Sequence, residues 1–298
     1  KEGGPGETIG GGMKGGDTTP IRTNNERKIV DKNEYHSGTD RLSSSGAKEL
    51  LRSPAHYQLR YGQDARRQKT SAAMSFGTAL HTLVLEGESV FKNSIAVDPG
   101  INKRTKAGKH EWQDFLARHQ HVKEGQFFKL EDVDQLYWLR DAVFDHPVAS
   151  QLLSKGKPEV YMEWDEVRDF GEGQDGVPCK LMADWVDDGV MIDLKTAVDA
   201  SPGGFARSVY NFKYHLSAEF YKRGYAAYNQ GEVPDWYWIV TEKETHQVAV
   251  YTMDDASRAI GSRLVDDALA LFSECQRTGL WGSYSTTAQE LVSPAWAR

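Results

Sequence analysis

The chain has 298 residues, of which 39% are hydrophobic and 27% charged, a composition ordinary for a soluble globular protein. Its net charge of −7 argues against a protein that coats nucleic acid through bulk charge, although an enzyme with basic residues concentrated in one channel remains compatible. Two cysteines exclude a disulfide framework or a four-cysteine metal site. No apolar run is long enough to span a membrane, and the first residues lack the apolar core of a secretion signal, so we expect a cytoplasmic protein.

Helices are predicted to dominate the beginning of the ordered chain. Residues 1–40 are rich in Gly, Thr, Asn and charge, which predicts a flexible N-terminal arm, and a single domain is expected over 41–298. Ser43 offers a helix N-cap, and Ser53 before a proline offers a second. A stronger helix is predicted over 71–86, where apolar residues recur at helical spacing.

The hydrophobic period changes in the second half of the chain. A basic loop leads into a helix within 101–119, and one or two helices are predicted over 130–154. Alternating apolar and polar residues then predict three strands, at 158–164, 179–186 and 190–196. A helix over 213–229, a hairpin over 235–253 and a helix over 255–277 follow. This order predicts an α/β or α+β fold with an N-terminal helical part.

One predicted hairpin gathers charged residues. Asp188-Gly189 is a strong signal for a two-residue turn. Pairing across it places Asp184 opposite Asp193, with Lys195 on the same face. That face is predicted to carry Met182, Asp184, Val186, Met191, Asp193 and Lys195. The other, expected to be the core face, carries Leu181, Ala183, Trp185, Val190, Ile192 and Leu194.

Opposed carboxylates on a strand pair repel each other, and partial burial raises the cost. Either one carboxyl is protonated or a cation lies between Asp184 and Asp193. Mg²⁺ typically takes one or two protein carboxylates and leaves positions for water and phosphate. Lys195 adds a donor that orients water or steadies charge on a phosphate. The alternative is an ordinary solvated strand face, but the apolar neighbours favour a metal site.

The D-(x)n-D-x-K pattern on a hairpin followed by a helix resembles the PD-(D/E)xK nuclease superfamily, with Ala183 where that name has proline. Four further stretches resemble its RecE-type (exonuclease VIII) branch, related to lambda exonuclease: SSSGAKELLRSPAHY, FGTALHTLVLEG, INKRTKAGKHEW and WGSYS…LVSPAWA. The resemblance covers about residues 43–298. It implies a restriction-endonuclease-like core, with a central mixed β-sheet flanked by helices.

The resemblance assigns site residues position by position. Gly77 and His81 match a G-x-x-x-H motif whose histidine lies at the metal site, although a core histidine is the alternative. The implied metal ligands are His81, Asp184, Asp193 and the Leu194 carbonyl, and Lys195 matches the catalytic lysine. Glu159 fits an acidic residue on the preceding strand, or else an exposed strand-end glutamate.

The helix after the lysine departs from the family pattern. The family usually has Q-x-x-x-Y there, and this chain has Ser217 and Tyr221. Serine lacks the reach and the amide of glutamine, so its role is open. Tyr221 matches a catalytic position and is otherwise a core residue.

Two basic clusters are candidates for contacts with DNA phosphates, although solvated loops commonly carry such runs. The first comprises Arg60, Arg66, Arg67 and Lys69. The second comprises Lys103, Arg104, Lys106 and Lys109.

The resulting hypothesis is a Mg²⁺-dependent exonuclease, with Mn²⁺ as a substitute, that degrades double-stranded DNA from its 5′ end. The polarity, a ring-shaped homo-oligomer around DNA and a single-strand annealing protein as partner come from the resemblance alone. An endonuclease or nickase of the same fold is the first alternative. A non-catalytic DNA-binding module is the second.

Overall fold

The computed structural model describes Tyr35 and residues 40–62, 71–167 and 176–293. The predicted arm over 1–40 lies outside the described residues except for Tyr35 and Asp40. Three residues of the first basic cluster also lie outside them: Arg66, Arg67 and Lys69. Within the described part, no helix has the length and apolar character needed to cross a membrane.

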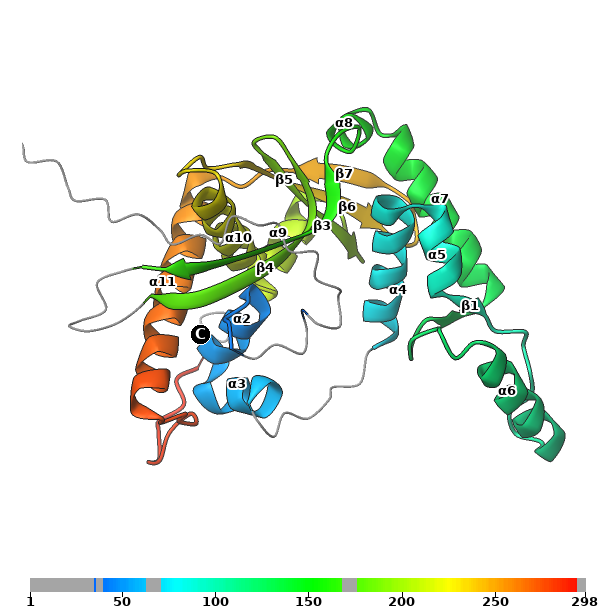
Figure 1. Ribbon diagram of the computed structural model, residues 1–298, viewed down its shortest axis with the longest axis horizontal. Coiled ribbons are helices and arrows are strands. Elements are labelled where there is room, and N and C mark those ends of the chain that lie inside the picture. The colour runs from blue at the N-terminus through cyan, green and yellow to red at the C-terminus, as the bar shows by residue number, and fades with distance from the viewer. Residues whose placement is uncertain (1–34, 36–39, 63–70, 168–175, 294–298) are drawn as a thin grey trace, which may run out of the picture.

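A five-stranded mixed sheet forms the centre of the fold, in the order β3-β4-β5-β6-β7 (Figure 1). The strands are β3 (Lys157–Glu166), β4 (Val177–Asp187), β5 (Val190–Ala197), β6 (Asp235–Glu242) and β7 (Val248–Tyr251). Strands β5 and β6 pair in parallel, and the other neighbours pair antiparallel. The central mixed sheet flanked by helices is therefore confirmed.

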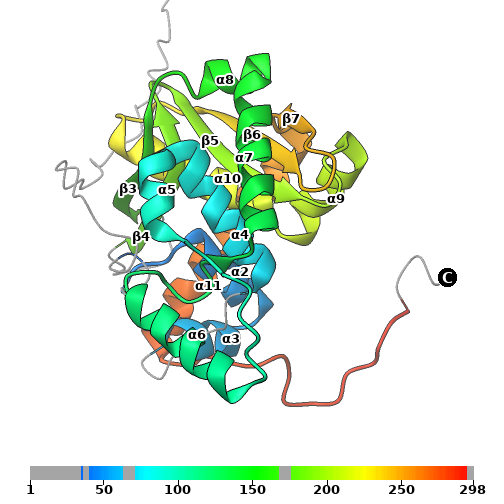
Figure 2. The same cartoon turned by 90° about the vertical axis from the view of Figure 1, so that its right-hand side faces the viewer.

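Helices cover both faces of this sheet (Figures 1 and 2). One side carries α2 (Ser44–Arg52), α3 (Pro54–Tyr61), α9 (Pro202–Asn211), α10 (Tyr214–Tyr228) and α11 (Asp255–Thr278). The other carries α4 (Ala72–His81), its π-helical continuation η1 (Thr82–Glu86), α5 (Glu88–Ser94), α7 (Leu130–Asp145) and α8 (Pro147–Leu152). Each side has its own buried apolar cluster, one containing Trp238 and Phe272, the other Leu80 and Ile239. Burial on both faces explains why the central strands are so rich in apolar residues.

A small arm projects from the body (Figures 1 and 2). It consists of β1 (Ala96–Val97), α6 (Lys106–Arg118) and β2 (Phe127–Phe128), and we call it the α6 arm. The two short strands pair in parallel, and Phe115 and Val122 are buried beneath the helix. The α6 arm therefore has a local apolar cluster separate from those of the sheet.

The β4–β5 hairpin has the predicted register. Trp185 pairs with Ile192, Val186 with Met191 and Asp187 with Val190, and Gly189 has the positive φ of 70° that the turn requires. The ladder between the two strands ends at Trp185 and Ile192, so β4 and β5 separate where Asp184 and Asp193 lie.

The edge of β4 freed by this separation is occupied by another part of the chain. The Leu42 N–H donates to the Pro178 carbonyl at 2.8 Å, and the Leu42 carbonyl accepts from the Lys180 N–H at 2.9 Å. This short parallel pairing satisfies backbone groups that β5 no longer reaches. Because α2 begins two residues later, the pairing also fixes the start of α2 against β4.

The predicted division of hairpin side chains between two faces is confirmed for Trp185 and Val186 but wrong for the part of β4 before Asp184. Leu181 and Ala183 pack in the same cluster as Met191, whereas Ile192 and Leu194 belong to the cluster on the opposite side. The alternation changes near Asp184, where β4 exchanges one pairing partner for another. The facing strand is irregular at the same level, since Glu159 has a φ of 51°, while the β3–β4 register is the same on both sides of Glu159 and Asp184.

Replacing Gly261 with alanine is expected to destabilise the fold. An added Cβ there would lie 2.4 Å from the His215 carbonyl oxygen, so α10 and α11 would have to move apart. We expect the free energy of unfolding to fall by about 2 kcal/mol, as measured by denaturant titration. The control is Gly203→Ala in α9, where nothing lies within 4 Å of the added Cβ. Equal stability of the two variants would contradict the close packing of α10 on α11.

Candidate active site

Two aspartates face each other where β4 and β5 separate. The Asp184 and Asp193 side chains are only 18% and 14% exposed, and a hydrogen bond joins their carboxyl groups. Asp184 Oδ2 also accepts from the Leu194 N–H at 3.1 Å. The Leu194 N–H is free to donate to a carboxylate because the pairing of β4 with β5 has already ended at Ile192. The predicted opposition of the two acids therefore appears in the structure.

The two carboxyls differ in their affinity for a proton. Burial, followed by the charge of Asp184, raises the pKa of Asp193. Burial acts in the same direction on Asp184, but the charges of His81 and Lys195 and the hydrogen bonds from Asp193 and Leu194 outweigh it and lower its pKa. Of the two carboxyls, Asp193 is therefore the one that takes up a proton first as the pH falls.

Lys195 lies directly beside the carboxylates. Its Nζ is 2.6 Å from Asp193 Oδ1 and 3.5 Å from the Leu194 carbonyl oxygen. Burial alone would lower the pKa of Lys195, but the charges of Asp193 and Asp184 raise it above its ordinary value. The amine is therefore a cation at neutral pH.

His81 reaches the same place from α4, on the other side of the sheet. Its Nε2 forms a short hydrogen bond with the Leu194 carbonyl, and its Nδ1 lies 3.5 Å from Asp184 Oδ2. Gly77, one turn earlier, faces Thr196, but an added Cβ would stand 3.6 Å from the Thr196 hydroxyl, an ordinary contact. Packing at this point therefore does not require glycine.

Tyr221 and Glu159 occupy different positions relative to this centre. Burial, followed by the charges of Tyr35, Asp184 and Asp193, raises the pKa of Tyr221 well above its ordinary value. Tyr221 therefore lies within electrostatic reach of both aspartates. Glu159 stands opposite Asp184 in the β3–β4 register.

Ser217 lies on α10, one turn before Tyr221. Its backbone N–H donates to the Lys213 carbonyl at 3.3 Å. Among the described residues, its hydroxyl has no hydrogen-bond partner. Serine thus stands where the resemblance predicts a glutamine, and its side chain is shorter.

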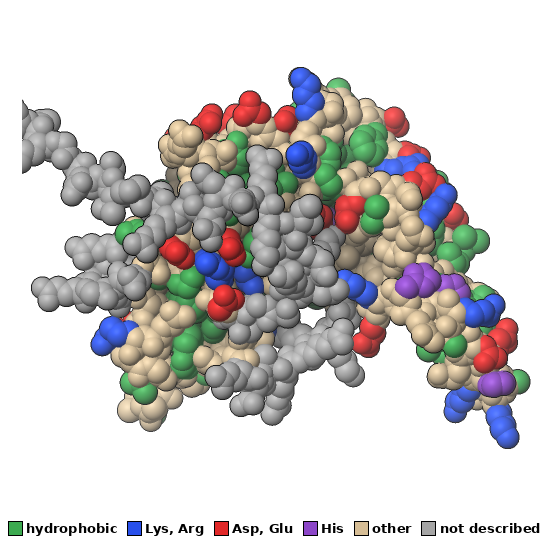
Figure 3. All heavy atoms as spheres, in the orientation of Figure 1, with side chains coloured by type: hydrophobic (Ala, Val, Ile, Leu, Met, Phe, Trp, Pro, Cys, Tyr) green, Lys and Arg blue, Asp and Glu red, His purple; other side chains and the backbone are tan. Residues whose placement is uncertain are grey.

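The predicted phosphate-binding residues lie away from the carboxylates or are already paired. Arg60 forms an ion pair with Glu49 at 2.7 Å, and Lys103 one with Asp98 at 2.7 Å. Three exposed residues just before and in the first turn of helix α6 have no ion pair within the described part: Arg104, Lys106 and Lys109. In Figure 3 acidic and basic side chains are interspersed over this face, with basic ones at the end of the arm.

The donor groups suit a hard divalent cation. Asp184, Asp193 and the Leu194 carbonyl offer oxygen atoms only, and Mg²⁺ commonly takes one or two protein carboxylates with water completing its shell. Among the described residues, including those of this site, no three or more His, Cys, Asp or Glu side chains are grouped so that they could hold a metal ion. His81 contacts two of these groups: its ring hydrogen-bonds to the Leu194 carbonyl and lies close to Asp184.

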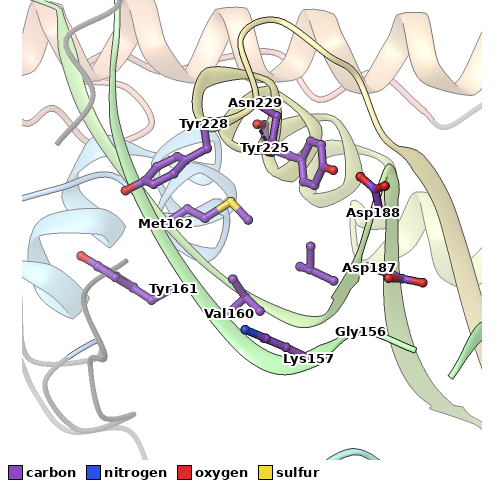
Figure 4. A pocket seen from close by; sticks show the side chains of 11 residues that line it. Gly156, Lys157, Val160, Tyr161, Met162, Asp187, Asp188, Tyr225, Tyr228 and Asn229 are labelled. Atoms are coloured by element: carbon purple, nitrogen blue, oxygen red, sulfur yellow. Dashed lines mark hydrogen bonds between the residues drawn. The ribbon is translucent and has the colours of Figure 1, made fainter. Parts of the chain in front are cut away.

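Two pockets of the described part lie away from the carboxylates. One of about 560 Å³ lies between β3, the β4–β5 turn and the end of α10 (Figure 4), with Asp187 and Asp188 across from Tyr225 and Tyr228. Another, of about 500 Å³, begins at Thr196 and is lined by Phe76, Phe128 and Lys243. We place the chemistry at the carboxylates because charge, hydrogen bonds and perturbed pKa values converge there.

Sequence reasoning missed two residues at this centre. Tyr214 opens α10, and its ring centroid lies 5.4 Å from Lys195 Nζ. Lys48, on α2, lies 5.3 Å from the same ring centroid. Lys48 lies in the stretch SSSGAKELLRSPAHY and Tyr214 in the helix predicted over 213–229. Nothing in the spacing of residues 48, 195 and 214 indicates that they meet.

Comparisons with known proteins agree with this fold. A family described as "PDDEXK-like domain of unknown function (DUF3799)" matches residues 43–293. A solved structure described as a "Putative exonuclease" from Eubacterium rectale aligns with a TM-score of 0.54 at 14% identity, covering 87% of this chain and 96% of that chain. The structure of SSO0001 aligns with a TM-score of only 0.28 at 12% identity, over 81% of this chain and 87% of that chain. No curated protein sequence matches the chain.

Proposed function

The chain belongs to the PDDEXK-like domain family DUF3799, and on that premise we propose that it is a divalent-metal-dependent exonuclease that degrades linear duplex DNA from the 5′ end. One observation carries the proposal: two mostly buried carboxylates, a backbone carbonyl and a lysine converge where β4 and β5 separate. The solved structure described as a "Putative exonuclease" shares the fold and supports the choice of end-directed cleavage. So does the RecE-type resemblance of the flanking stretches.

Asp184, Asp193 and the Leu194 carbonyl would hold the cation, Mg²⁺ or Mn²⁺. When bound, it would neutralise charge on the scissile phosphate and acidify a water molecule. Lys195, already a cation, is placed to donate to a phosphate oxygen or to orient the attacking water. His81, hydrogen-bonded to the Leu194 carbonyl, fixes the orientation of that carbonyl. Tyr221, whose raised pKa keeps its hydroxyl protonated, is a neutral donor beside the two acids.

The assembly proposal follows from the same resemblance. We propose a ring-shaped homo-oligomer, with the exposed basic residues of the α6 arm facing the DNA and a single-strand annealing protein as partner. Such an arrangement would reconcile a net charge of −7 with DNA binding, because a local positive channel suffices for phosphate contacts.

The test compares linear, nicked and closed-circular duplexes of one sequence, with Mg²⁺, with Ca²⁺ and with EDTA. The proposal predicts Mg²⁺-dependent loss of linear DNA alone, with label released first from the 5′ ends. Cleavage of closed circles would favour an endonuclease or nickase. Absence of metal-dependent cleavage of all three, with binding retained, would favour a non-catalytic module.

A further inference from the structure

Lys48 is a cation at the active site that the proposed reaction does not yet use. It lies half-buried on α2, and its Nζ is 5.3 Å from the centroid of the Tyr214 ring. Lys195 Nζ is 5.4 Å from the same centroid. Two ammonium groups, from helix α2 and strand β5, therefore converge on one aromatic ring next to the carboxylates.

Lys48 differs from Lys195 in its surroundings. Within the described residues, no carboxylate lies within ion-pair distance of its ammonium group. Burial, followed by the charge of Lys195, lowers the pKa of Lys48 to about 8. A partly buried cation without a direct ion-pair partner costs free energy, and the charge of Asp193 and the contact with Tyr214 offset only part of it. An anion bound beside Lys48 would remove that cost.

The position of Lys48 is fixed by the strand that carries the first aspartate. Leu42 pairs with β4 at Pro178 and Lys180, and the Ser43 hydroxyl accepts from the Gly46 N–H to cap α2. Lys48 follows on the first turns of that helix. Its charge is thus held at a set place relative to the carboxylates, as a group that orients substrate requires.

We propose that Lys48 binds a non-bridging oxygen of a DNA phosphate at the carboxylate site, so that Lys48 and Lys195 hold the phosphodiester from two sides of Tyr214. This inference rests on the proposed function, since it names a substrate contact of that site. It identifies the ligand only as a nucleic-acid phosphate. Nothing about the base or the sugar is implied.

The experiment is a double-mutant cycle between enzyme and substrate. Single-turnover cleavage is measured on duplexes that carry one uncharged methylphosphonate at successive positions from the end, with wild type and Lys48→Met. On unmodified DNA we expect Lys48→Met to lose about 100-fold in rate, as when one donor to a developing anion is removed. With methylphosphonate at the contacted phosphate, wild type and Lys48→Met should cleave at the same rate. Lys48→Arg, which keeps the charge, should lose less.

Arg52→Met is the matched control, because it removes an exposed cation from the same helix. It should cleave like wild type at every position. Thermal unfolding shows whether each variant is folded. If Lys48→Met loses the same factor on every substrate, or loses nothing, Lys48 makes no phosphate contact and the inference fails.

A binding measurement separates this inference from the proposed function. Ca²⁺ replaces Mg²⁺, and the dissociation constant for a short duplex is measured against salt concentration. Lys48→Met should weaken binding and reduce the slope of log K against log salt by about 1. If wild type cleaves no DNA, the proposed function fails while this measurement still decides the phosphate contact. An unchanged slope overturns it.

Discussion

Replacing Asp193 with asparagine is expected to reduce Mg²⁺-dependent cleavage of linear duplex DNA by at least about 1000-fold. Loss of a ligand carboxylate removes several kcal/mol of charge stabilisation, and every 1.4 kcal/mol or so is a factor of ten. Calorimetric titration with Mn²⁺ should show a parallel loss of metal affinity. The measurement on metal affinity does not depend on catalysis.

The same substitution should stabilise the protein in EDTA. Asp193 is held close to Asp184 at a cost, and asparagine removes the like charge while keeping a hydrogen-bonding side chain. The wild type should gain stability when Mg²⁺ is added, and the variant should not. Asp188→Asn is the control, because it makes the same chemical change in the exposed turn of the same hairpin, where Asn-Gly is equally favourable. If the two variants behave alike, Asp193 is not a ligand.

Replacing Lys195 with methionine is expected to reduce cleavage by about 1000-fold, the typical size of a proton-transfer or charge-stabilising contribution. The effect on stability should be opposite to that of Asp193→Asn. Removing the ammonium group 2.6 Å from Asp193 leaves two buried acids without their cation, so the variant should be less stable in EDTA. Added Mg²⁺ should restore more stability to the variant than to the wild type.

The pH dependence gives a further check on Lys195. Its pKa is raised in the folded state, so its contribution to stability is complete below the unfolded value of 10.5 and disappears only as pH rises above it. The destabilisation by Lys195→Met in EDTA should therefore be unchanged between about pH 7 and pH 9. Lys157→Met, at an exposed lysine that begins β3, is the control. A deficit that vanishes within that range would show that Lys195 is neutral there.

Local patterns predicted most of the elements and the geometry of the hairpin. Asp188-Gly189 specifies a two-residue turn, and the turn fixes which residues pair, so the opposition of Asp184 and Asp193 could be counted from the sequence. The face of the sheet on which each β4 side chain lies could not be predicted in the same way. Alternation assumes one uninterrupted ladder, and β4 changes its partner from Leu42 to β5 near Asp184. That exchange is a tertiary event with no local signature.

Helix α9 was missed for a related reason. It opens with Pro-Gly-Gly, and glycine lowers helix propensity by close to 1 kcal/mol per residue. Tertiary contacts override this, because Ser201 caps the helix and Phe205 and Val209 are buried beneath it. Lys48 and Tyr214 could not be predicted as neighbours, since their meeting depends on how α2 and α10 pack together.

The pairing of Leu42 with β4 has a consequence for the order in which the molecule folds. It joins two segments from distant parts of the chain, and contacts of large sequence separation form late because closing a long loop costs entropy. The β4–β5 hairpin is local and can form early, with both aspartates in place. Lys48, carried by α2, arrives only when the distant pairing closes. Partly folded chains should therefore contain the acids without the second lysine, and full activity should be acquired in the last cooperative step of folding.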